Sequence, residues 1–108
     1  MSSVGSRTQV VQRVIYRMPL DPKDSLAYEV LAQIVGSLVD RAEAVRIVPT
    51  PQPEGTCFAI KVHHEDIGKV IGKQGRTARA LRVILWAVGM KMRRRYSLDI
   101  VPDFPPQV

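Results

Sequence analysis

Two glycines separated by two residues, Gly72 and Gly75, constrain this chain more than any other feature of its sequence. They interrupt an apolar and basic stretch, residues 67–79, between two segments with helical character. Glycine permits a tight backbone turn and lets a ligand approach the main chain closely. A helix that begins at Arg76 places its N-terminal N–H groups and its positive dipole end beside this turn. The pattern predicts an anion-binding loop, and the backbone of a nucleic acid suits it.

The charge distribution favours a polyanionic partner. The chain has 108 residues and a formal net charge of +6. Residues 67–98 carry nine lysines and arginines and no acidic residue, whereas residues 1–66 carry seven basic and eight acidic residues. A surface that serves only solubility usually mixes both signs, so we interpret the segment as a nucleic-acid footprint, with a solvated basic face as the alternative. The run at residues 93–95 is either a further phosphate contact or a solvated turn.

Length and composition favour a single folded domain. Apolar residues make up 45% of the chain, which is enough for an independent core. No apolar run approaches the roughly 20 residues of a membrane helix, and the N-terminal residues lack the apolar segment of a secretory signal. Cys57 is the single cysteine, which excludes an internal disulfide and favours a cytoplasmic location.

Helical patterns account for three segments. Asp21 and Pro22 suit the N-cap and the first position of a helix that ends near Asp40. A short helix is expected over residues 65–71, and a longer one over residues 76–90. The core face of the longer helix is expected to comprise Ala78, Leu81, Ile84, Leu85 and Val88.

Strand patterns account for three further segments, at residues 44–48, 56–62 and 96–101. The prolines and the glycine of residues 49–55 disfavour regular structure and predict a connecting loop, and Pro102 is expected to end the last strand. The element order is therefore α-β-β-α-α-β, which predicts an α+β fold with helices on one face of a three-stranded sheet.

The boundaries of the domain follow from the same patterns. Residues 21–102 are expected to form it, and residues 103–108 are expected to be a C-terminal tail. Residues 1–20 form an N-terminal arm whose pattern fits a helix, an added strand or a flexible segment.

The glycine pair fits neither of two common phosphate motifs. In a P-loop, Lys73 would have to be glycine, and in the dinucleotide fingerprint Val70 would have to be glycine. Residues 70–75 instead resemble the Ile-Gly-x-x-Gly core of the KH domain, whose GXXG loop binds about four nucleotides of a single strand. Residues 68–82 carry most of a closer resemblance to the small bacterial single-KH-domain proteins of the KhpA family.

The resemblance implies a fold and a biological role. The fold is a single type II KH domain, with three helices on one face of a three-stranded mixed sheet. The role is that of a cytoplasmic RNA-binding protein, an RNA chaperone or post-transcriptional regulator linked to cell-wall biogenesis and cell shape. The expected partners are single-stranded RNA and either a second copy of the chain or a larger KH-containing protein of the KhpB type.

The predicted RNA groove lies between the helix pair and the strand at residues 56–62. Backbone N–H groups of the loop would contact phosphates, and basic side chains would neutralise them. Core packing is the alternative for the aliphatic members. No aromatic side chain falls in this groove, so we expect weak sequence preference. The expected RNA-binding residues are Ile60, Lys61, Lys69, Val70, Ile71, Gly72, Lys73, Gln74, Gly75, Arg76 and Arg79.

The second face of the helix at residues 76–90 is basic at its start and apolar towards its end. A helix that is apolar on both sides is buried on both sides, so we expect a dimer interface anchored by Trp86. The alternative is that residues 1–20 fold over Trp86 within one chain. The expected interface residues are Val83, Trp86, Ala87 and Met90.

An enzyme is the main alternative class. Adjacent histidines at a strand end point in opposite directions and rarely bind one metal, so a solvated junction explains the cluster better. We expect no catalytic site, metal, cofactor or small-molecule substrate. An assembly module with little RNA binding, and a binder of single-stranded DNA, remain open alternatives. The residues that suggest a thiol or metal site are Cys57, His63, His64, Glu65 and Asp66.

Overall fold

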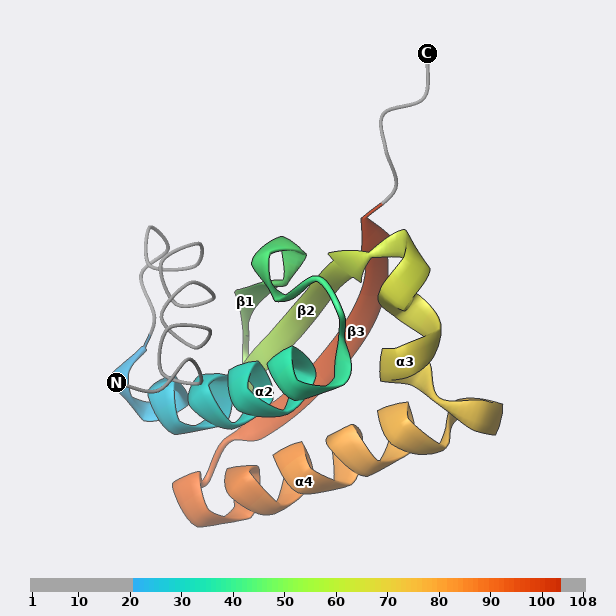
Figure 1. Ribbon diagram of the computed structural model, residues 1–108. Coiled ribbons are helices and arrows are strands. Elements are labelled where there is room, and N and C mark those ends of the chain that lie inside the picture. Colours follow the sequence, from blue (N-terminus) through green and yellow to red (C-terminus); the bar gives the residue numbers. More distant parts are fainter. Residues whose placement is uncertain (1–20, 104–108) are drawn as a thin grey trace, which may run out of the picture.

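A computed structural model of the chain describes residues 21–103, so the predictions for the arm of residues 1–20 and for the tail beyond Asp103 lie outside the described part. Three α-helices pack on one face of a three-stranded sheet (Figure 1). None of the helices in residues 21–103 is long and apolar enough to cross a membrane. The helices are α2 (Ser25–Leu38), α3 (Ile67–Ile71) and α4 (Arg76–Met92).

The sheet is mixed, as the resemblance to type II KH domains implies. Its strand order is β1-β2-β3, with β1 antiparallel and β3 parallel to the central strand β2. Parallel pairing of β2 with β3 requires a crossover connection, which α3 and α4 supply. The glycine loop therefore lies within this crossover. The strands are β1 (Arg46–Gln52), β2 (Gly55–His63) and β3 (Arg95–Asp103).

The loop predicted over residues 49–55 is wrong, because β1 continues through Pro49 and Pro51 as far as Gln52. β1 is an edge strand. Pro49 and Pro51 are two residues apart, so their backbone nitrogens point to the same side of the strand. On an edge strand that side can face away from the sheet, where no N–H donor is needed. The same reasoning explains why β3, at the other edge, continues through Pro102 instead of ending there.

The first strand also begins later than expected. A 3-10 turn, η2 (Ala42–Ala44), occupies the start of the predicted strand at residues 44–48. The turn bonds Val45 N–H to the carbonyl of Ala42 at 3.1 Å, which brings Val45 into the core before the extended backbone begins at Arg46.

The core lies between the sheet and the helices. Phe58, Ile60 and Val62 of β2 are fully buried there, which confirms the predicted inward face of this strand. Ile84 is 38% exposed, so its assignment to the core face of α4 is wrong. Ala78, Leu81 and Leu85 of the same predicted face are buried, which confirms them as core residues.

α4 runs two residues beyond its predicted end at Met90, and the chain then reverses tightly past Gly89. A Cβ atom on Gly89 would overlap the carbonyl oxygen of Arg94. Arg93 adopts a left-handed conformation, and Arg94 N–H donates to the carbonyl of Gly89 at 3.0 Å. This is the usual way in which a left-handed residue ends a helix.

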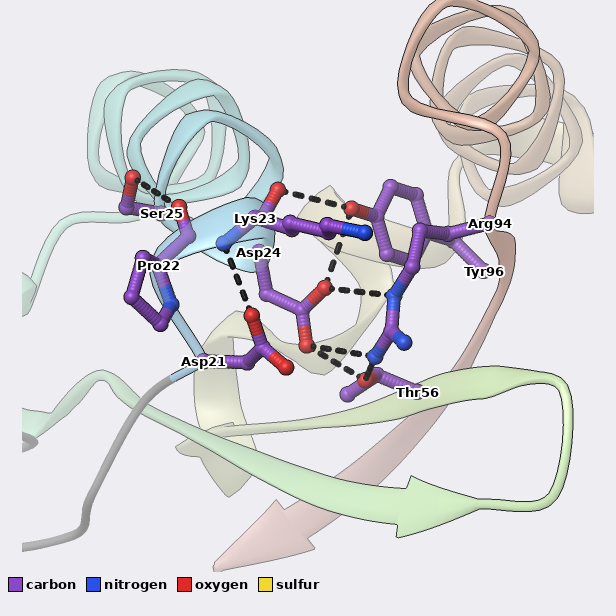
Figure 2. Close-up of polar contacts among 8 residues, drawn as sticks. All are labelled: Asp21, Pro22, Lys23, Asp24, Ser25, Thr56, Arg94 and Tyr96. Atoms are coloured by element: carbon purple, nitrogen blue, oxygen red, sulfur yellow. Dashed lines mark hydrogen bonds and ion pairs between the residues drawn. The ribbon is translucent and has the colours of Figure 1, made fainter.

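A buried polar network joins the start of α2 to the α4–β3 connection (Figure 2). Asp24 accepts from Arg94 at 3.1 Å and 3.2 Å, and also from the Thr56 hydroxyl. The Tyr96 hydroxyl lies 3.0 Å from Asp24 Oδ1, and burial together with this carboxylate raises the pKa of Tyr96 to about 12. Arg94 is therefore an internal ion-pair partner, neither of the two roles considered for the run at residues 93–95.

Candidate nucleic-acid interface

The loop between α3 and α4 requires glycine at Gly72. This residue has φ 79° and ψ 169°, a conformation that side chains disfavour, and a Cβ atom there would overlap the Thr77 hydroxyl. Gly75 has φ 74°, and Gln74 is left-handed as well, with φ 57°. This backbone makes one tight turn and leaves the side chains of Lys73 and Gln74 exposed at its tip.

The first turn of α4 gathers positive charge and has no acidic residue of its own. No side chain caps this turn. Arg76 and Arg79 are exposed there, next to the positive end of the helix dipole. Cations at this end destabilise a helix, whereas a bound anion stabilises it. The arrangement therefore suits a phosphate and has no evident structural benefit.

An open groove of about 680 Å³ runs from this loop along the boundary between α4 and β3. The predicted position of the groove, against the strand at residues 56–62, is wrong. That strand is β2, the central strand of the sheet, whereas β3 forms the edge next to α4. The residues that line the groove are Ile71, Gly75, Ala78, Arg79, Arg82, Asp99, Ile100 and Val101.

Of the predicted RNA-binding residues, Ile71, Gly75 and Arg79 line this groove, and three others lie away from both the groove and the glycine loop. Ile60 and Val70 are fully buried, so they pack in the core and present no surface to a base. Lys61 alternates with the buried residues of β2 and therefore lies on the sheet face opposite the helices. Ile71, in contrast, is partly exposed and lines the groove.

Lys69 is engaged in ion pairs. Its Nζ lies 3.2 Å from Asp40 and 3.4 Å from Asp66, and these carboxylates raise the pKa of Lys69. Burial opposes the ionisation of Asp66, but backbone N–H donors of Arg41 and Asp40, together with Lys69, outweigh it and hold the pKa of Asp66 below its ordinary value. Arg41 also pairs with Glu65 at 2.7 Å. This cluster holds α3 against the end of α2 and so positions the glycine loop.

Sequence reasoning missed Arg82 and the three β3 residues Asp99, Ile100 and Val101. Arg82 follows Arg79 by three residues, so helical spacing alone could have placed both on one side of α4. No local signal identifies the β3 residues, because their proximity to α4 depends on the parallel pairing of β3 with β2.

The predicted interface residues of α4 lie at the surface of the described chain. Val83, Trp86 and Met90 are 59%, 63% and 64% exposed, and Ala87 is exposed as well. A second hollow of about 520 Å³ lies beside two of them, and it is lined by Gln52, Trp86, Met90, Arg94, Arg95, Tyr96 and Ser97.

The histidines form a structured junction. His63 Nδ1 accepts from Glu65 N–H at 3.1 Å, and the rings of His63 and His64 stack with centroids 4.3 Å apart. Among residues 21–103, no three histidine, cysteine or acidic side chains are grouped so that they could hold a metal ion.

Comparison with known proteins gives a consistent result. A family model described as "KhpA/KhpB, KH domain" matches residues 28–100. The RNA-binding protein KhpA of Halalkalibacterium halodurans is 44% identical over 68 residues, which cover 63% of this chain and 90% of that protein. The proteins of the same name from Treponema pallidum and Bacillus subtilis are 42% and 35% identical, and cover 68% and 67% of this chain and 91% and 89% of their own length. No solved structure shows a significant match.

Proposed function

Because the chain belongs to the KhpA/KhpB KH-domain family, we propose that it binds single-stranded RNA by holding the sugar–phosphate backbone at the Gly72–Gly75 loop. The observation that carries this proposal is the exposed loop at the uncapped start of α4, which opens directly into a groove. Backbone N–H groups at the start of a helix can bind a phosphate at the protein surface, so no enclosed cavity is needed. Lys73, Arg76 and Arg79 supply the neutralising charge.

The groove between α4 and β3 receives the bases. Ile71, Ile100 and Val101 give it apolar surface, on which unstacked bases can lie. β3 pairs only with β2 in the described chain, so its other edge presents backbone N–H and carbonyl groups to the edges of the bases. Asp99 adds a side-chain acceptor for an exocyclic amino group.

A loop of this kind implies that few nucleotides are bound and that binding has weak sequence preference. A GXXG loop spans about four nucleotides, and phosphate contacts carry no sequence information. A protein that binds many RNAs briefly suits the role of an RNA chaperone. Its action on RNA is binding, without a catalytic step.

Pairing with a second copy, or with a larger KhpB-like protein, would link two such sites and raise their combined affinity through effective concentration. Trp86 and Met90 line the hollow beside β3, whereas Val83 and Ala87 do not. We place the protein contact on Val83 and Ala87, whose side chains are exposed on α4 and line neither hollow.

Replacement of Lys73 and Gln74 by aspartate tests the proposed function. Both side chains are exposed at the tip of the loop, so the double variant reverses the charge without entering the core. We expect loss of binding to a fluorescently labelled RNA oligonucleotide in anisotropy titrations, because aspartates repel phosphates.

A matched control carries the same two kinds of substitution elsewhere. Lys91→Asp with Gln33→Asp changes exposed residues that do not line the groove, so this variant should bind RNA almost as the unmodified protein does. Thermal unfolding followed by circular dichroism establishes that both variants are folded. Undiminished binding by the folded loop variant would disprove the proposed role of the loop.

A further inference from the structure

One side of α4 carries groove-lining residues along almost its whole length. Gly75, Arg79, Arg82, Trp86 and Met90 follow one another at intervals of four, three, four and four residues. Residues at this spacing share one face of a helix. The first three line the groove at the glycine loop, and the last two line the second hollow.

β3 borders both hollows. It contributes Asp99 to the first groove and Ser97 to the second hollow. These residues pair with Ala59 and Cys57 of β2, so their side chains lie on the sheet face opposite the helices, on the edge strand next to α4. Arg82 and Trp86, one helical turn apart on α4, belong to the first and the second hollow. The two hollows therefore follow one another along the α4–β3 boundary.

Trp86 is a large aromatic side chain with 63% of its surface exposed within the described chain. Basic residues flank it on both sides. Arg82 lies one turn earlier on the same face, and the Arg95 side chain is 83% exposed in the second hollow, with a single 3.5 Å ion pair to Glu54. An exposed indole between arginines is typical of a surface that stacks bases while neutralising their phosphates.

We propose that the RNA groove continues to Trp86 and that its indole stacks on a base beyond the nucleotides held at the glycine loop. The inference rests on the proposed RNA binding and assigns a second subsite to it. Charge decides between RNA and a second copy of the chain as the occupant. A second copy docked here would bring Arg82 and Arg95 close to the same basic residues of its partner, whereas a polyanion complements them.

The subsite needs a longer RNA than the loop alone. Gly75 and Trp86 are separated by eleven residues of α4, or roughly 16 Å along the helix axis. An oligonucleotide of about four nucleotides fills the groove at the loop, and one of about eight, twice that footprint, extends to Trp86.

Trp86 is the single tryptophan of the chain, so its fluorescence reports on this subsite alone. We expect an eight-nucleotide uridine oligomer to quench the fluorescence of the full-length protein, and a four-nucleotide oligomer to bind at the loop with little quenching. Trp86→Ala should weaken binding of the longer oligomer about tenfold, as expected for the loss of one stacked base, and leave the shorter one unchanged. Trp86→Phe should retain most of the affinity, and Leu26→Ala, an exposed apolar residue of α2 that lines neither hollow, serves as a matched control.

Three outcomes separate the possibilities. If neither oligomer binds the unmodified protein, the proposed function itself fails. If the shorter oligomer binds but the longer one gains no affinity and causes no quenching, the subsite is disproved and the loop function stands. If Trp86→Ala halves the mass in light scattering, and RNA leaves the Trp86 fluorescence of the unmodified protein unchanged, the indole is a protein contact and the inference is wrong.

Discussion

At the scale of single residues, the glycine loop provides the sharpest test of the structure. Gly72→Ala should lower the free energy of unfolding by at least about 2 kcal/mol, because its φ of 79° with ψ 169° strains any side chain. The added methyl group would also overlap the Thr77 hydroxyl. Urea unfolding measures the loss.

Two other glycines of the same region are matched controls for this substitution. Gly75→Ala meets no neighbouring atom within 4 Å but keeps a left-handed backbone, so it should cost about 1 kcal/mol. Gly68→Ala also meets no atom within 4 Å, and it lies within α3, so it should stabilise by about 0.5 kcal/mol. Equal effects at all three positions would contradict the described backbone.

The residue scale also shows what the sequence could and could not predict about the site. Gly72, Gly75 and the basic residues after them are identifiable because their chemistry depends on local spacing. The prediction that Val70 and Ile60 contact RNA is wrong, because both are buried. Their burial depends on tertiary packing against other elements, which local sequence does not reveal. Lys69 likewise finds two carboxylates whose proximity no local pattern indicates.

At the scale of elements, α3 is positioned by Asp66, a buried carboxylate that receives hydrogen bonds from the backbone just after α2. Asp66→Asn should lower the free energy of unfolding by about 2 kcal/mol at neutral pH, because hydrogen bonds to a charged group are replaced by neutral ones. RNA binding should weaken as well, since α3 carries the glycine loop.

The pH dependence distinguishes this mechanism from a packing defect. The pKa of Asp66 lies below its ordinary value of 3.8 in the folded protein. Its ionised form therefore stabilises the fold fully above that value, and this stabilisation is lost as the pH falls through the folded-state pKa. The difference between Asp66→Asn and the unmodified protein should shrink below about pH 4. A constant difference across the acid range would exclude the electrostatic explanation.

Element order and type could be predicted from the sequence, because periodicity and capping residues are local. The predicted position of the groove was wrong, since the choice of edge strand is a property of the whole sheet. β2 carries the more apolar pattern, and β3 nevertheless borders α4 because it pairs in parallel on that side. The predicted loop at residues 49–55 was wrong because an edge strand tolerates Pro49 and Pro51.

At the scale of the whole molecule, the excess positive charge of residues 67–98 should govern RNA affinity. Each neutralised phosphate of a single strand contributes about −0.7 to the slope of log affinity against log salt. With the three contacts of Lys73, Arg76 and Arg79, the slope should be about −2, and Arg79→Gln should flatten it by about 0.7. Anisotropy titrations at several salt concentrations measure both slopes. A protein that serves only as an assembly module would give no RNA signal at any salt concentration.

The prolines of β1 have a consequence for crowded copies of the chain. An edge strand with a full set of N–H donors invites a strand of another molecule to pair with it. Pro49 and Pro51 each remove one of the donors that such pairing would need. The remaining edge, on β3, borders the groove that RNA would occupy. Copies of the chain that come close together are therefore protected at β1 against merging into a cross-β array.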